Sequence, residues 1–381
     1  MGGKGKEWQP EWRKFQDRIT GISTLQLTSY TGHSHHFYFT ENGWYDEGRK
    51  LLFCSDRNNK TDLFSICIET GVITQLTDHD KTYEGLSPCL HPDETRVYFR
   101  KDQQIIELDL NTLKEKVIYE ELSSWLGGNL NCTADGKYLI TCKREDLSDK
   151  VYTDLGNGYI GHRALMEARP KSQIIKISLE TNEVTVVYQE DNFITHINTS
   201  PTKKELITFC HEGPWNLVDH RIWVLNIESL DVWKIRERKE EDEMIGHEYW
   251  YQDGETIGYH GFRQDRTGFF GKIKYDHTEE EEVEFNFVNW HAFSNDFSKI
   301  VVDGRAPPLK NIIIWYKNED GFSKPKVLCE HRCSFHVQKV HAHPRFTPDG
   351  KKLLYTSDRN GYANLYLVDV PDDANELPDY V

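Results

Sequence analysis

The stretch that decides the fold is Phe346-Thr347-Pro348-Asp349-Gly350-Lys351-Lys352-Leu353-Leu354-Tyr355. It places an aromatic residue before a polar turn with Asp-Gly, then a basic residue and a run of strand-forming residues. Asp-Gly favours turns, and aromatic and aliphatic residues favour strands. Variants of this unit recur along the chain. They begin at Tyr45, His91, Thr133, Ser200, Gln252, Phe293 and Phe346.

Most turns follow one another at intervals in the 40s to low 50s, the length of a four-stranded propeller blade. One longer gap, between Gly136 and Lys203, is explained by an insertion near 147–170. The spacing predicts a single domain over 1–381, with an acidic tail at 371–381. Its seven repeats are placed at roughly 29–77, 78–119, 120–188, 189–236, 237–284, 285–329 and 330–370.

The last repeat lacks an outer strand. Asn364–Val370 matches the third strand of the unit, and the chain then enters the acidic tail. At the other end of the chain, Gly21–Thr28 closely resembles the outer strand Gly71–Thr77. A strand over 21–28 is therefore expected to complete the last blade and to close the ring, which removes exposed sheet edges. The predicted fold is an all-β, seven-bladed β-propeller.

Composition narrows the class of partner. The chain is 37% hydrophobic and 28% charged, which suits a globular protein, and its formal charge of −16 argues against nucleic acid as a partner. No apolar run is long enough for a membrane span, and the first residues do not form a secretory signal. The eight scattered cysteines are then expected to be reduced, and the protein to be cytoplasmic with no membrane partner.

Histidines recur at one position of the repeat. Seven residues before the turn glycine or its equivalent stand His196, His247 and His343, and the sixth repeat has Trp290 there, followed by His291. This position is the end of the inner strand, which lines the channel of a propeller. Four consecutive blades are thus expected to direct imidazole-bearing strands at one channel mouth. A lone histidine at a strand start is more often structural, so the grouping carries the argument.

Loops between the second and third strands add polar groups to the same rim. They contain His211, Arg221, Arg263 and Arg305 in the fourth to sixth repeats. Stability alone would treat all blades alike, so this asymmetry indicates a functional rim. His196, His211, Arg263 and Arg305 are the candidate substrate-binding residues. The acidic run Thr278–Glu282 is interpreted instead as a solvated hairpin end.

Gln338, His341 and His343 suggest a metal site. In an extended strand His341 and His343 share one face, with Cα atoms about 6–7 Å apart. With a histidine of a neighbouring blade they predict a divalent cation held by imidazoles and an amide oxygen. Imidazole suits Zn, Fe or Ni and an amide oxygen suits Mn, so the metal stays open. The segment His33–His36 could also bind metal, but we prefer a polar loop.

Three motifs together resemble a known family. They are Cys210-His211-Glu212-Gly213-Pro214, Gly246-His247-Glu248-Tyr249-Trp250 and Gln338-x-x-His341-x-His343-Pro344. The sequence resembles the bacterial oligogalacturonate lyases, cytoplasmic seven-bladed propellers of pectin catabolism, from about Phe15 to Pro371. The resemblance implies a metal, usually manganese, on His291, Gln338, His341 and His343. It also implies His247 as catalytic base and Arg221 as its assistant. The chain departs from the family at Ala342, where proline is usual, and at Trp215, where histidine is usual.

The implied function is metal-dependent β-elimination. The substrate would be a short, often unsaturated oligogalacturonide, a small anionic oligosaccharide, and the product 4-deoxy-5-keto-uronate. His247 would remove the proton at C5, while the metal and Arg221 neutralise the uronate carboxylate. Two alternatives stay open. One is a lyase or epimerase for another uronate-containing oligosaccharide, and the other is a non-catalytic propeller that serves as a scaffold for protein partners.

Overall fold

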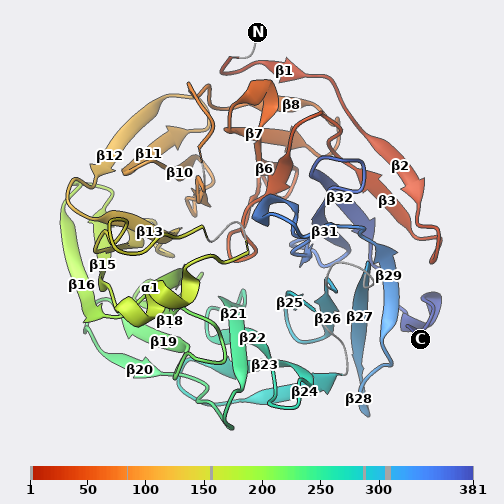
Figure 1. Cartoon of the computed structure of the whole chain (residues 1–381). Helices are drawn as coiled ribbons and strands as arrows, with labels where there is room; N and C mark the ends of the chain where they lie inside the picture. Colours follow the sequence, from red (N-terminus) through yellow and green to blue (C-terminus); the bar gives the residue numbers. More distant parts are fainter. Residues whose placement is uncertain (1–2, 84, 155–157, 286–288, 305–309, 381) are drawn as a thin grey trace. The chain divides into compact units, whose positions relative to one another are not determined.

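The computed structural model describes residues 3–83, 85–154, 158–285, 289–304 and 310–380. Strands dominate these residues, as Figure 1 shows. The chain divides into two compact units, and each is described by itself. The first unit combines Met1–Glu84 with Phe287–Val381, and the second is the continuous segment Gly85–Asn286.

The second unit contains four antiparallel sheets, in each of which every strand pairs with the next strand of the chain. The first sheet consists of β9 (Cys89–Leu90), β10 (Arg96–Lys101), β11 (Gln104–Asp109) and β12 (Glu115–Glu120). The second consists of β13 (Trp125–Cys132), β14 (Tyr138–Arg144), β15 (Lys171–Ser178) and β16 (Val184–Asp191). The third consists of β17 (Ile194–Thr199), β18 (Leu206–His211), β19 (Ile222–Asn226) and β20 (Val232–Lys234). The fourth consists of β21 (Met244–Trp250), β22 (Thr256–Phe262), β23 (Gly268–Lys274) and β24 (Glu281–Phe285).

The first unit contains the other three sheets. One runs in the order β1 (Glu7–Trp8), β8 (Ile73–Gln75), β7 (Asp62–Cys67), β6 (Lys50–Ser55) and β4 (Ser34–His36), and β5 (Trp44–Tyr45) also pairs with β6. Another contains β25 (Ala292–Phe293), β26 (Lys299–Val302), β27 (Asn311–Asn318), β28 (Gly321–Phe322) and β29 (Lys326–Glu330). The last runs in the order β2 (Arg13–Gln16), β3 (Ser23–Gln26), β32 (Asn364–Asp369), β31 (Lys352–Ser357) and β30 (Arg345–Phe346). Three short 3-10 helices are also present: η1 (Arg57–Asn59), η2 (Gln338–Val340) and η3 (Ala374–Glu376).

The closing strand predicted over 21–28 is confirmed. Strand β3 pairs antiparallel with β32, with Leu25 opposite Leu367, and the two lie side by side in Figure 1. Leu27 joins Leu354, Leu365 and other buried residues in one apolar cluster. Because burial of apolar area is the main driving force of folding, this cluster fixes the chain's first residues to its last strands. Strand β2, which extends the same sheet beyond β3, was not predicted.

The acidic tail is docked on the sheet of β29. The backbone N–H of Val327 donates to the carbonyl of Pro378 at 3.0 Å, and Nζ of Lys326 lies 2.6 Å from a carboxylate oxygen of Asp379. Both contacts lie within the first unit. The tail is therefore part of the folded first unit, and its residues cover an edge strand.

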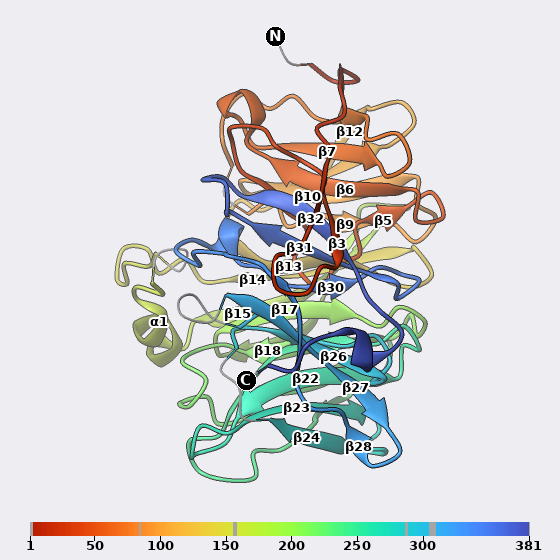
Figure 2. The ribbon, with the colours of Figure 1, turned by 90° about the vertical axis from the view of Figure 1, so that its right-hand side faces the viewer.

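The insertion near 147–170 supplies the helix of the second unit. Helix α1 (His162–Ala168) lies to one side of that unit's sheets in Figure 2. Its Leu165 packs with Leu147 and Phe193 in a small apolar cluster. Phe193 directly precedes β17, so the insertion is anchored beside the start of an inner strand.

Candidate functional site

A backbone kink explains the recurring histidine position. The pairing of β17 with β18 shifts register between Thr195 and Asn198, and the pairing of β21 with β22 shifts between Gly246 and Tyr249. Inside these bulges His196 has φ of 48° and His247 has φ of 52°. In the first unit His343 has φ of 39°. A positive φ is uncommon for a residue with a side chain, and bulges redirect side chains next to active sites. The repeated histidine position is therefore a repeated strained kink.

Three buried imidazoles converge in the first unit, and we call His291, His341 and His343 the imidazole trio. The ring centroid of His343 lies 5.3 Å from that of His291 and 5.4 Å from that of His341. Their exposed fractions are 0%, 8% and 4% in chain order. Histidines of two neighbouring repeats thus meet as predicted.

The local conformation at the trio differs from the prediction. An extended strand was expected through His341 and His343, and this is wrong. Gln338 opens helix η2, the carbonyl of Gln338 accepts from the backbone N–H of His341, and strand β30 begins only at Arg345. The positive φ of His343 ends the extended path. The two rings still meet, because a kinked turn brings them together. Gln338 itself is exposed, in contrast to the trio.

The surroundings of the trio suit a cation. Burial lowers the pKa of His341 to about 4, so its ring is neutral at neutral pH and offers a lone pair. Nδ1 of His341 has no hydrogen-bond partner among the described residues. Asp303 accepts hydrogen bonds from the backbone N–H groups of Trp290 and His291, which fixes the backbone that carries one ring of the trio. Neutral imidazoles held this close are the donor set that divalent transition metals prefer.

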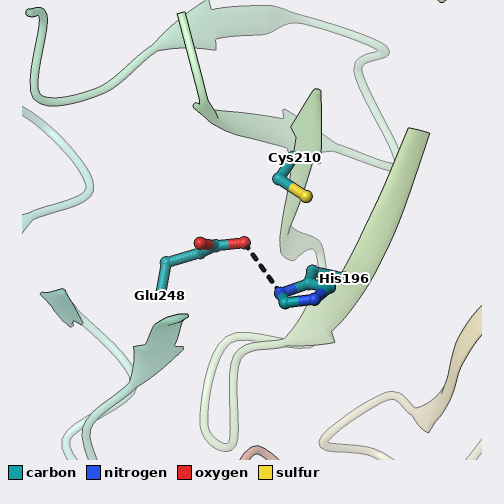
Figure 3. Close-up of side chains that lie close together, drawn as sticks. All are labelled: His196, Cys210 and Glu248. Atoms are coloured by element: carbon teal, nitrogen blue, oxygen red, sulfur yellow. Dashed lines mark ion pairs between the residues drawn. The ribbon is translucent and has the colours of Figure 1, made fainter. Parts of the chain in front are cut away.

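In the second unit Arg221 lies between two carboxylates. Its Nε donates to Glu248 at 3.0 Å and its Nη1 to Glu212 at 3.1 Å. Nδ1 of His196 lies 3.3 Å from Glu248 and 3.5 Å from Nη2 of Arg221. Figure 3 shows the imidazole of His196 facing the carboxylate of Glu248, with Cys210 nearby. We call Arg221, Glu212, Glu248 and His196 the Arg221 network.

The Arg221 network is charged although it is buried. The guanidinium holds the pKa of Glu248 at about 2, against the opposing effect of burial, and keeps that of Glu212 well below its usual range. The two carboxylates and one guanidinium sum to one negative charge. Ligand atoms of His196, Cys210 and Glu248 lie within 4.8 Å of one another, which is close enough for a metal ion. However, burial raises the pKa of the Cys210 thiol, and the guanidinium already neutralises Glu248, so this group does not suit a cation.

The insertion contributes to this network. Nε2 of His162, on α1, lies 3.4 Å from a carboxylate oxygen of Glu212. Gly213 has φ of 157°, and a Cβ there would lie 2.2 Å from the sulfur of Met166, so the helix packs directly on the loop. The sequence identified the insertion but not His162. The feature of the sequence that could have indicated this contact is the Gly213-Pro214 pair, because a glycine permits another segment to approach closely.

His247 is paired with a second histidine. Its Nδ1 lies 2.8 Å from Nε2 of His260, and the two rings stack with centroids 5.0 Å apart. The indole of Trp215 meets both rings edge-on, at 5.2 Å from His247 and 5.7 Å from His260. Both histidines are buried. Sequence analysis named His247 as the base but gave His260 no role.

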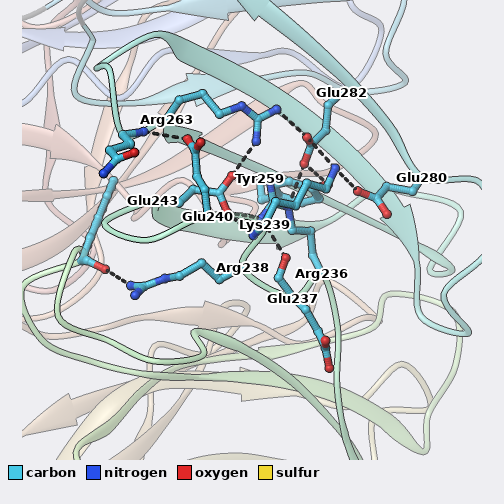
Figure 4. A network of polar contacts seen from close by, with 12 residues as sticks. Arg236, Glu237, Arg238, Lys239, Glu240, Glu243, Tyr259, Arg263, Glu280 and Glu282 are labelled. Atoms are coloured by element: carbon cyan, nitrogen blue, oxygen red, sulfur yellow. Dashed lines mark hydrogen bonds and ion pairs between the residues drawn. The ribbon is translucent and has the colours of Figure 1, made fainter.

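Two predicted substrate-binding residues are engaged by carboxylates. Nε2 of His211 lies 2.5 Å from Glu190. Arg263 donates to Glu243, Glu282 and Glu284. Figure 4 shows Arg263 with the first two of these carboxylates. Glu282 also binds Arg236 and its side chain is only 8% exposed, so the interpretation of the acidic run as a solvated hairpin end is wrong at this residue. Arg305 lies outside the described residues.

The segment His33–His36 includes strand β4, which pairs with β6, so the polar loop expected there is wrong. Nε2 of His36 lies 3.2 Å from the carbonyl of Ala342, which stands between two members of the imidazole trio. Nδ1 of His33 accepts from the backbone N–H of Ala363. Among the described helices, none combines the length and apolar character that crossing a membrane requires.

The sequence model of the oligogalacturonate lyase family matches residues 2–374. The chain belongs to this family. It is 30% identical to an oligogalacturonate lyase of Dickeya dadantii and 29% identical to an oligogalacturonide lyase of Pectobacterium atrosepticum. Each alignment covers 97% of this chain and 98% of the relative. Membership of the oligogalacturonate lyase family makes the protein a lyase, as predicted.

Solved structures support the same assignment. An oligogalacturonate lyase in complex with manganese superimposes with a TM-score of 0.89 at 26% identity, over 98% of this chain and all of that chain. An oligogalacturonate lyase from Vibrio parahaemolyticus gives a TM-score of 0.85 at 27% identity, over 97% of this chain and 99% of that one. Together with the seven antiparallel sheets that the described residues form, these similarities confirm the seven-bladed β-propeller fold.

Proposed function

We propose that the protein cleaves short, often unsaturated oligogalacturonides by β-elimination and releases 4-deoxy-5-keto-uronate. Removal of the C5 proton, which is α to the uronate carboxylate, precedes or accompanies loss of the C4 oxygen. Such a reaction needs a proton acceptor and positive charge near the carboxylate. Family membership over residues 2–374 is the observation that carries the proposal. The buried histidines and arginine give it candidate residues.

His247 is the proposed base. A neutral imidazole has an unperturbed pKa near 6.5 and accepts a proton at neutral pH. Proton abstraction turns His247 into a cation. The Arg221 network includes Glu248, the next residue in the chain, and its ionised groups carry one negative charge in sum. Glu248 favours an imidazolium on the adjacent residue, whereas the guanidinium of Arg221 opposes one.

Arg221 is the proposed assistant, but its surroundings restrict what it can do. Two of its nitrogens already donate to Glu212 and Glu248, and its side chain is only 3% exposed. A paired interaction of the whole guanidinium with a substrate carboxylate would break both ion pairs. Nη2, which points toward Nδ1 of His196, is the nitrogen best placed to serve a substrate. His196 then lies where it can contact the same substrate group.

The imidazole trio is the proposed holder of a divalent cation, with Gln338 as the fourth ligand. Manganese is the proposed ion, because a solved relative is described in complex with it. When bound, the cation supplies positive charge that offsets the developing negative charge on the uronate carboxylate. The neutral state of His341 and its aromatic neighbours Trp290 and Phe335 support this assignment.

Incubation of digalacturonate with manganese-loaded protein tests the proposal, with chelator-treated protein as the matched control. We expect unsaturated or keto-uronate product, detected by mass spectrometry, from the loaded protein and little from the chelated one. Absence of such product from both would overturn the assignment. A panel of alginate, ulvan, rhamnogalacturonan and heparin fragments separates it from a lyase or epimerase for another uronate.

A further inference from the structure

His260 lies directly behind the proposed base. It belongs to β22, and Gly246, the residue before His247, is its partner across the β21–β22 ladder. The bulge that follows turns His247 so that its Nδ1 faces Nε2 of His260 at 2.8 Å. His260 has no exposed surface and His247 is 4% exposed. The contact therefore has the distance and the burial of a strong hydrogen bond.

A hydrogen bond between two neutral imidazoles can have two arrangements. In one, Nδ1–H of His247 donates to the lone pair of His260, and Nε2 of His247 keeps its own lone pair. In the other, Nε2–H of His260 donates, and Nε2 of His247 carries a proton. Only the first arrangement leaves His247 able to accept a proton. It also needs no rearrangement afterwards, since the imidazolium of His247 still carries the donating Nδ1–H.

We propose that His260 is a positioning residue that accepts the hydrogen bond of His247 Nδ1–H and so keeps Nε2 of His247 as the proton-accepting atom. The inference rests on the proposed function. It assigns to a second imidazole the role that a carboxylate has behind the catalytic histidine in many hydrolases.

The environment of His260 favours this role over that of a proton carrier. Burial and the nearby guanidinium of Arg221 lower the pKa of His260 to about 3, whereas Glu248 acts in the opposite direction. A protonated His260 is therefore disfavoured at neutral pH. The proton taken from the substrate stays on His247, and His260 remains a neutral acceptor.

Trp215 encloses the pair. Its indole lies edge-on to both imidazoles, and its ring lies 5.4 Å from the guanidinium carbon of Arg221. A Cβ at Gly246 would lie 2.4 Å from this indole, so residue 246 must be glycine for Trp215 to pack there. An indole over the pair limits access of water to the hydrogen bond and strengthens it.

Three variants of the full-length, manganese-loaded protein test the role of His260. His260→Phe removes the acceptor, and His260→Gln replaces it with an amide oxygen. His91→Phe is the matched control, because His91 is also buried in the second unit but contacts the carbonyl of Gly136 and the carboxylate of Asp93. We expect kcat/KM on digalacturonate to fall about 10²-fold or more in His260→Phe. In the profile of kcat/KM against pH, the acidic limb of His260→Phe should shift to lower pH. The reason is that His247 loses the acceptor that stabilises its charged form. His260→Gln should recover most of the wild-type kcat/KM and most of the wild-type position of the acidic limb. His91→Phe should change neither quantity.

A folded His260→Phe with wild-type kcat/KM and an unshifted acidic limb would overturn the inference. So would a folded His260→Gln as impaired as His260→Phe. A second readout does not depend on activity. Long-range ¹H–¹⁵N correlation spectra of histidine-labelled protein, assigned with His247→Ala, should show His247 protonated at Nδ1, and protonation at Nε2 would contradict it. If the wild type cleaves no uronate, the proposed function fails, whereas the spectra still test the pair.

Discussion

The imidazole trio and the His247–His260 pair use the same side chain in different surroundings. The trio lies among aromatic rings, with Phe39 at 4.3 Å from His291 and Trp290 at 5.3 Å from His341. The pair lies beside the guanidinium of Arg221 and the ionised carboxylate of Glu248. An apolar shell keeps imidazoles neutral and available as ligands. The charged groups beside the pair act on it in opposite directions, because the guanidinium of Arg221 lowers the pKa of His260 and Glu248 raises it. The two groups of histidines thus differ in whether aromatic rings or ionised side chains surround them.

Loss of metal is the largest effect we expect. His343→Ala removes a central member of the trio, so the protein should bind little manganese and have little activity. His247→Ala should bind manganese at the wild-type stoichiometry, because His247 belongs to the pair. Elemental analysis after gel filtration measures both. Loss of metal in His247→Ala would break the distinction between the two regions.

Removal of the base comes next. His247→Ala should lower kcat by about 10²–10⁴-fold, the range that a positioned acid or base contributes. KM should change less, because the missing group acts in the transition state of proton transfer and not in substrate binding. Steady-state kinetics on digalacturonate measure both constants, with circular dichroism as the control for folding. Activity of His247→Ala within a few-fold of the wild type would remove His247 from the mechanism.

Breaking the Arg221 network should reduce stability as well as activity. Arg221→Met leaves Glu212 and Glu248 buried without their counter-ion, which costs about 3–5 kcal/mol of unfolding free energy. Urea unfolding followed by tryptophan fluorescence measures the loss. The triple change Arg221→Met, Glu212→Gln and Glu248→Gln should recover part of it, because it removes the uncompensated charges. Equal stability of Arg221→Met and the wild type would show that the network does not contribute to the unfolding free energy.

The smallest effect is a change in how stability depends on pH. His260 has a folded pKa of about 3, below its unfolded value near 6.5, so the unfolded chain takes up the proton first as pH falls. The unfolding free energy that depends on a neutral His260 is complete above pH 6.5 and is lost as the pH falls from 6.5 to 3. Glu248 adds a loss between about pH 4.5 and 2, since its folded pKa is about 2.

Between pH 6 and 4.5 the slope of unfolding free energy against pH should therefore be smaller in His260→Phe than in the wild type. The expected difference approaches about 1.4 kcal/mol per pH unit. Urea unfolding at several pH values measures it. Parallel slopes in His260→Phe and the wild type would show that His260 is not held neutral.

Much of the fold could be predicted because its signals are local. The Asp-Gly turn unit and the Gly21–Thr28 match reveal strands and their order without knowledge of distant contacts. The candidate site was harder to predict from the sequence. His260 matters because a bulge in β21 turns His247 toward it, and sequence shows neither the bulge nor the register. Arg263 seemed available on the rim, but Glu243 and Glu282 bind it from other segments of the chain.

The division of the chain has a consequence for folding order. The second unit is one continuous segment, Gly85–Asn286, and its strands can pair as they leave the ribosome. The first unit is split, and β3 must wait for β32, which is made only after the whole second unit. Long-range pairing of this kind slows folding. Until then the segment of β3 exposes Leu25 and Leu27, so the newly made chain is prone to aggregation at this segment.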